Sequence, residues 1–196
     1  MFVINQPHIP DFTNPLGLLV HCHQRIEGQL ETLARSAEVL RAGEMNPVTA
    51  FDAIDAACKH LAVAGVKHTE DEEVSLFPRL RERGGAGGEE AIAAMAELES
   101  QHRTAEQMHK QFDGFVLTLP RDGSADRREL DCLSEMVADL VAFYRPHIFM
   151  ENNLVFPIAG RVLSPAEIHA LGEEMSERRK ELFQATPARG WEISKA

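Results

Sequence analysis

The sequence has little of several residue types that particular classes of protein require. Its 196 residues include one tryptophan, one tyrosine and three cysteines, and Asp plus Glu (31) outnumber Lys plus Arg (20). The formal charge of −11, with no offsetting basic stretch, makes nucleic acid and anionic membranes poor partners. No apolar run reaches roughly 18 residues, the length that a membrane-spanning helix needs.

The cysteines and the N-terminal residues indicate the cellular compartment in which we expect the protein. Cys22, Cys58 and Cys132 lie far apart and form no C-x-x-C pair. An odd number of cysteines without a disulfide framework fits reduced thiols in the cytoplasm. The first residues show no basic segment followed by a long apolar one, so we expect no signal peptide and a cytoplasmic protein.

Helix signals are dense, whereas alternating strand patterns are nearly absent. Asn14-Pro15 and Asn46-Pro47 are typical of an N-cap followed by proline at the first helical position, and Asp126 with Glu129 resembles a capping box. Glycine-rich or proline-containing breaks separate the helical stretches. The predicted helices are 14–42, 46–82, 88–119, 126–159 and a shorter one at 164–183.

Long helices with short connections favour an all-α fold, namely an up-down antiparallel four-helix bundle with a short additional C-terminal helix. Apolar residues recur at helical spacing in each long segment, as an inward face requires. We expect an N-terminal segment at 1–13, the bundle domain at 14–183 and a loose polar tail at 184–196. Near the end of the last helix, Arg178 and Arg179 are predicted to complement the helix dipole.

The chain contains an internal repeat that carries four of its nine histidines. HTEDEEVSLFP and HIFMENNLVFP both read His-x3-Glu-x4-Phe-Pro and start 79 residues apart, and the same offset maps His23 onto His102. We expect the two Phe-Pro steps to bend or end their helices. The repeat gives one His-x3-Glu pair in each long helix: His23/Glu27, His68/Glu72, His102/Glu106 and His147/Glu151.

These pairs predict a metal centre. Residues four apart lie on one face of a helix, so both members of a pair can point to one place in the core. Buried carboxylates and imidazoles are costly unless a cation compensates them. Mixed nitrogen and oxygen donors suit iron, manganese or zinc, and six to eight candidates exceed the four ligands of one tetrahedral zinc. We therefore predict two metal ions, with iron as first choice and manganese as second.

Other residues have simpler explanations. His8, His21, His60 and His169 are predicted to lie at the surface or in packing contacts, whereas His109 could lie one layer from the metals. Glu70, Asp71 and Glu73 are expected on the solvated face beside Glu72. The sequence has no H-E-x-x-H motif, which argues against a zincin protease, and both Glu-x-x-His motifs of a ferritin-like site would fall in one helix.

Four segments resemble the hemerythrin-like family, the His-His-Glu cation-binding domains. They are PLGLLVHCHQRIE, HTEDEEVSLFPRL, ESQHR and YRPHIFMENNLVFP, and the resemblance spans about residues 14–180. It implies a four-helix bundle that holds non-haem iron, usually as an oxo- or hydroxo-bridged pair. Matching the motifs implies the metal ligands His23, His68, Glu72, His102, His147 and Glu151, with Glu72 and Glu151 bridging.

The sequence departs from oxygen-carrying hemerythrins at two helices. Glu106 stands where those proteins have a second histidine, and the fourth-helix motif is His-x3-Glu rather than His-x4-Asp. If Glu106 binds metal, its anionic oxygen should favour the ferric state and weaken reversible dioxygen binding. Glu27 is a possible partner of an imidazole N–H, and Tyr144 could hydrogen-bond an oxygen species on the metal.

The combined prediction is a metal-binding protein rather than a dedicated enzyme. We expect it to bind or sense dioxygen, nitric oxide, peroxide or iron. A di-iron enzyme that consumes peroxide or nitric oxide, and an iron storage or delivery protein, are the alternatives. The predicted partner is a small diatomic or peroxide ligand, with no nucleic acid, no membrane and no identified protein partner.

Overall fold

A computed structural model describes residues 10–84 and 88–185 of the chain. Over these ranges the structure consists of helices and short turns without a strand, which confirms the all-helical prediction. None of the described helices is long and apolar enough to cross a membrane. His8, most of the predicted N-terminal segment and most of the predicted polar tail lie outside the described residues.

The helices begin and end near the predicted positions because the local capping signals are used. The Asn14 side chain accepts a hydrogen bond from the Gly17 N–H at 3.1 Å. Asp126 and Glu129 form the predicted capping box. The last helix extends slightly beyond its predicted end. The main helices are α1 (Pro15–Ala42), α2 (Pro47–Glu70), α4 (Gly88–Thr118), α5 (Arg127–Met150) and α7 (Pro165–Ala185).

Two of the long helical stretches contain a π-helical segment at equivalent positions of the repeat. Segment η1 (Asp71–Leu76) joins α2 to α3 (Phe77–Arg83), and η2 (Glu151–Val155) joins α5 to α6 (Phe156–Val162). In both, the backbone N–H of the phenylalanine bonds a carbonyl five residues earlier.

The Phe-Pro steps were predicted to bend or end their helices, and the second of these outcomes is wrong because both helical stretches continue past the proline. Pro78 and Pro157 lie in the first turns of α3 and α6, which continue for seven residues each. A proline is tolerated there because its missing N–H is not needed in the first turn of a helix. The wider turn of the π-helical segment lies directly before the Phe-Pro step, so the departure from regular α-helical hydrogen bonding occurs there rather than after the proline.

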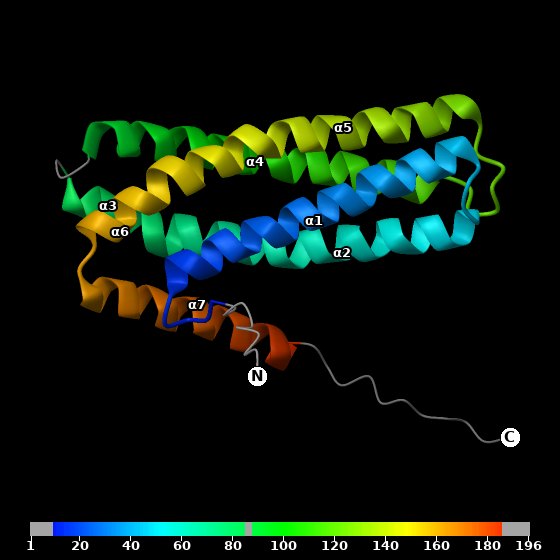
Figure 1. The fold of residues 1–196 in the computed structure, drawn as a ribbon. Helices are drawn as coiled ribbons and strands as arrows, with labels where there is room; N and C mark the ends of the chain where they lie inside the picture. Colours follow the sequence, from blue (N-terminus) through cyan, green and yellow to red (C-terminus); the bar gives the residue numbers. More distant parts are fainter. Residues whose placement is uncertain (1–9, 85–87, 186–196) are drawn as a thin grey trace, which may run out of the picture.

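The long helices lie alongside one another as an all-helical bundle (Figure 1). Helix α1 contacts α2 and α5, and α4 contacts α5, α3 and α2. Helix α7 lies outside these four stretches, against α1 and η1. One face of the bundle is therefore covered by an extra helix.

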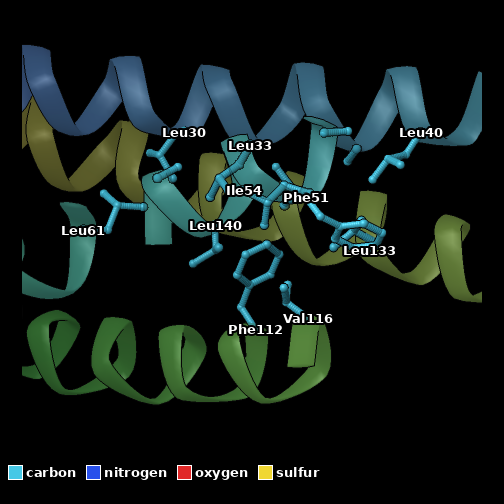
Figure 2. Packing of buried hydrophobic residues seen from close by; sticks show 14 of the residues in the cluster. Leu30, Leu33, Leu40, Phe51, Ile54, Leu61, Phe112, Val116, Leu133 and Leu140 are labelled. Carbon is cyan, nitrogen blue, oxygen red and sulfur yellow. The ribbon is translucent and has the colours of Figure 1, made fainter. Parts of the chain in front are cut away.

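Two clusters of buried apolar side chains fill the interior. The first includes Leu33, Phe51 and Phe112 from α1, α2 and α4 (Figure 2). The second includes Leu19 and Leu171, so it reaches α7. Burial of these side chains drives the helices together.

A polar layer separates the two clusters along the bundle. On α1, His23 lies between Leu19 of the second cluster and Ile26 of the first. On the fourth stretch, His147 and Glu151 follow Leu140 of the first cluster and precede Val155 of the second. The polar layer is thus enclosed by apolar side chains on both sides.

Candidate metal centre

Six side chains from the four helical stretches converge in the polar layer. The His23 and His68 Nε2 atoms lie 2.8 Å apart, and the His102 and His147 rings are 4.9 Å apart between centroids. These histidines therefore form two pairs, one from α1 and α2 and one from α4 and α5. The converging residues are the six ligands implied by the resemblance: His23, His68, Glu72, His102, His147 and Glu151.

Glu72 lies between the two histidine pairs. Its Oε1 atom is 3.4 Å from His68 Nε2, and its Oε2 atom is 3.4 Å from His102 Nε2. Each oxygen of this carboxylate thus faces a different pair.

Glu151 has the same relation to the histidines, from the opposite half of the repeat. Its Oε2 atom lies 2.9 Å from His23 Nε2, and its Oε1 atom lies 3.3 Å from His147 Nε2. The donor atoms define two groups that could each hold a cation: His23, His68, Glu72 and Glu151, and His102, His147 and Glu151.

The buried donor atoms fit a cation. Glu72 and Glu151 are fully buried, yet both oxygens of Glu72 and Oε1 of Glu151 lack a hydrogen-bond partner, as does His102 Nε2. Such groups normally find partners because an unpaired buried charge is costly. Metal ions would supply the missing charge and accept the lone pairs, so this donor set fits metal binding.

In the metal-free cluster the pKa values of the ligand side chains are shifted in different directions. Burial raises the pKa of Glu72 to about 8, and the nearby Glu151 carboxylate adds to this effect. Burial lowers the pKa of His147 to about 4. For His102, burial opposes protonation, but the neighbouring carboxylates of Glu151, Glu72 and Glu73 outweigh it and raise its pKa to about 10. Without a cation, protons thus supply part of the positive charge.

Three of the histidines are held by a second layer of polar side chains. The Nδ1 atom of His23 lies 2.8 Å from Asn152 Oδ1, and that of His147 lies 2.9 Å from Gln101 Oε1. Such bonds orient the ring and leave Nε2 free for a metal. Sequence reasoning missed both partners.

Glu73 is the third of these partners, 2.8 Å from His102 Nδ1. The Glu73 side chain remains 34% exposed, so it lies at the edge of the solvated face as predicted, but its contact with His102 was not predicted. The repeat could have revealed it, because Glu73 and Asn152 occupy equivalent positions 79 residues apart.

The structure does not bring Glu27 or Glu106 into the cluster. Glu27 is exposed, and the Glu106 side chain is 63% exposed and bonded to Lys110. On α1 the inward residues after His23 lie three and seven positions further along, so the fourth position points outward.

The other two glutamates point inward, and each accepts, at its backbone carbonyl, the five-residue hydrogen bond of a π-helical segment. After His147, the inward positions are Glu151 and Val155, a spacing of four residues. The wider turn of a π-helix keeps every fourth residue on one face. The Glu151 N–H still bonds the His147 carbonyl as in an ordinary helix, so η2 acts on the direction of Val155 rather than on that of Glu151.

A cavity of about 490 Å³ leads to the cluster between α2 and α4. His68, His102 and His147 are among the residues that line it, together with Tyr144 and His109. The Tyr144 hydroxyl lies 2.9 Å from His109 Nε2, and burial lowers the pKa of His109. Both residues are half-buried near the cluster without belonging to it.

The remaining described histidines lie outside the cluster. His21 contacts Gln24, His60 is half-buried, and the His169 side chain is 74% exposed.

Asp71, beside Glu72, connects the cluster region to α7. It is fully buried and receives hydrogen bonds from Arg178 (2.6 Å) and Arg179. The prediction that Asp71 is solvated is wrong, because α7 covers it. The two arginines bind this carboxylate, in place of the predicted interaction with the dipole of their own helix.

Comparison with known proteins gives one match. The family model for the hemerythrin HHE cation binding domain matches residues 14–159. A comparison with curated proteins gives no match. The matched range contains all six converging side chains.

Proposed function

The chain belongs to the hemerythrin HHE cation-binding family, and from that premise we propose that it holds two metal ions in a non-haem centre. The bundle would be of the up-down antiparallel four-helix type, with α7 added. One observation carries the proposal: Glu72 and Glu151 each direct their two oxygens toward different histidine pairs. A carboxylate in this position can bridge two cations.

Iron is the proposed metal, with manganese second. Imidazole nitrogen and carboxylate oxygen suit both, whereas structural zinc prefers four ligands in a closed tetrahedral site. Iron would supply a redox-active centre to which dioxygen, nitric oxide or peroxide can bind. The surrounding apolar clusters would exclude bulk water from the centre and strengthen electrostatic interactions within it.

The cavity supports a small ligand as the physiological partner. It gives access to the cluster from the side of α2 and α4, and Tyr144 is among the residues that line it. If His109 Nε2–H donates to the Tyr144 oxygen, the phenol hydrogen is free to point into the cavity. The unpaired state of Cys22, Cys58 and Cys132 supports a reducing, cytoplasmic compartment.

Metal analysis of the purified chain tests the proposal. After anaerobic loading with Fe²⁺ and desalting, we expect two irons per chain and, after oxidation, ferric charge-transfer absorption. His68→Ala should lose metal, whereas His21→Ala, outside the cluster, should retain it. Stoichiometric zinc, or no metal at all, would overturn the proposal.

The cavity also supports an enzyme that consumes peroxide or nitric oxide, because its volume exceeds that of a diatomic molecule many times over. Stopped-flow mixing of the reduced protein with dioxygen, peroxide or nitric oxide separates the two functions. A reversible adduct would support binding or sensing. Repeated turnover of excess peroxide or nitric oxide would support the enzyme.

A further inference from the structure

One of the four clustered histidines lacks the polar partner that the other three have. The Nδ1 atoms of His23, His102 and His147 lie within 2.8–2.9 Å of a side-chain oxygen. The Nδ1 atom of His68 is buried and has no hydrogen-bond partner. His68 itself is only 3% exposed, so this nitrogen is shielded from bulk solvent.

The internal repeat identifies where this partner is missing. His147 is held by Gln101, and the 79-residue offset maps these residues onto His68 and Cys22. A thiol therefore occupies the position from which an amide reaches the histidine in the other half. A thiol is shorter than a glutamine side chain and accepts hydrogen bonds weakly.

The difference between Cys22 and Gln101 occurs on the face of the bundle that α7 covers. Asp71 and Ser75 are buried and receive hydrogen bonds from arginines of α7, whereas their repeat equivalents are Met150 and Leu154. Burial raises the pKa of the Cys22 thiol, and the nearby Arg179 opposes this rise. Cys22 thus lies beside the arginine–aspartate contact of α7.

The missing partner has a consequence for the metal that His68 would bind. Partners at the second ring nitrogen fix the orientation of a metal-bound imidazole and raise its basicity, and their loss typically costs about 10–100-fold in metal affinity. We propose that the position of His23 and His68 releases its ion before that of His102 and His147, because only His68 lacks a partner at its second ring nitrogen. This inference rests on the two-metal centre proposed above.

Metal release to a chelator measures the difference. The chain loaded anaerobically with Fe²⁺ is mixed with excess chromogenic chelator, and release is followed over time. We expect two phases of equal amplitude with rates at least about tenfold apart. Two bound metals released in one phase would overturn the inference and leave the proposed centre intact. A chain that holds fewer than two metals would overturn both.

Exchanging the two equivalent residues assigns the phases. Cys22→Gln should slow the fast phase, and the matched variant Gln101→Cys should accelerate the slow phase toward the fast one. The second variant leaves the α7 contact unchanged, so it tests the inference even if Cys22→Gln disturbs folding. Phases that stay unchanged in folded Gln101→Cys would overturn the inference.

Discussion

Glu151 is the residue on which the proposed centre depends most directly, because it belongs to both groups of donors that could hold a cation. Glu151→Gln keeps the size of the side chain and removes its charge. We expect the variant to retain less than one metal per chain after desalting, as measured by elemental analysis. Glu106→Gln is the matched control, since Glu106 is exposed and bonded only to Lys110. Full metal content in Glu151→Gln would contradict a bridging role.

Tyr144 provides a second test at the level of a single residue, in this case of ligand binding rather than of metal binding. Tyr144→Phe removes only the hydroxyl of a residue that lines the cavity. Metal content should stay at two, while azide, used as an anionic probe, should bind about fivefold more weakly because one hydrogen bond is lost. Optical titration with azide measures this. An unchanged affinity would reduce Tyr144 to a packing residue.

At the residue scale the sequence predicted the converging histidines because a repeat and an apolar stripe mark them. Asp71 was placed on the wrong face, because the same pattern of charged residues arises on a solvated helix. Its burial depends on two arginines of α7 about a hundred positions away. A long-range contact of this kind leaves no periodic signal.

At the scale of helices, α7 is held to the bundle by a buried charge contact. Replacing both Arg178 and Arg179 by Met leaves the fully buried Asp71 without compensation. We expect the free energy of unfolding to fall by about 3–5 kcal/mol, as when other buried ion pairs are broken. Urea unfolding followed by circular dichroism measures it.

The exposed pair of Arg127 and Asp131 provides the control for this substitution. Arg127 is 65% exposed in its side chain, so Arg127→Met should change stability by less than about 1 kcal/mol. If the free energy of unfolding falls by equally small amounts in the Arg178/Arg179 double variant and in Arg127→Met, α7 is held by its apolar contacts alone.

Helix positions were predictable from capping residues, whereas the π-helical segments were not. Asn14, Asp126 and similar residues act locally, so their effect is visible in a short stretch of sequence. The His-x3-Glu spacing fits both an ordinary helix and a π-helical segment. The burial of Val155, eight positions after His147, distinguishes them, and burial depends on the packed bundle.

For the whole molecule, the polar layer interrupts what would otherwise be one continuous apolar core. The metal-free bundle must keep Glu72 and Glu151 buried with unpaired oxygens between two apolar clusters. Cations that bind only the folded chain stabilise it, by about 2.7 kcal/mol at a free concentration of 100 times Kd. The layer therefore couples folding to metal supply.

The same layer predicts that metal uptake releases protons. At pH 7 the metal-free chain holds protons on Glu72, whose pKa is raised to about 8 by burial, and on His102, whose pKa is raised to about 10 because neighbouring carboxylates outweigh burial. The pKa of His23 is also raised, because its contacts with Glu151 outweigh burial. The pKa of His147 is lowered to about 4 by burial, so that ring is already free. Metals need deprotonated ligands, so loading at pH 7 should release the protons held on Glu72, His102 and His23. At pH 9 Glu72 has already lost its proton, so the release should be smaller by at least about one proton per chain, a difference that a pH indicator in weak buffer measures. Equal release at both pH values would contradict the protonation of Glu72 in the metal-free cluster.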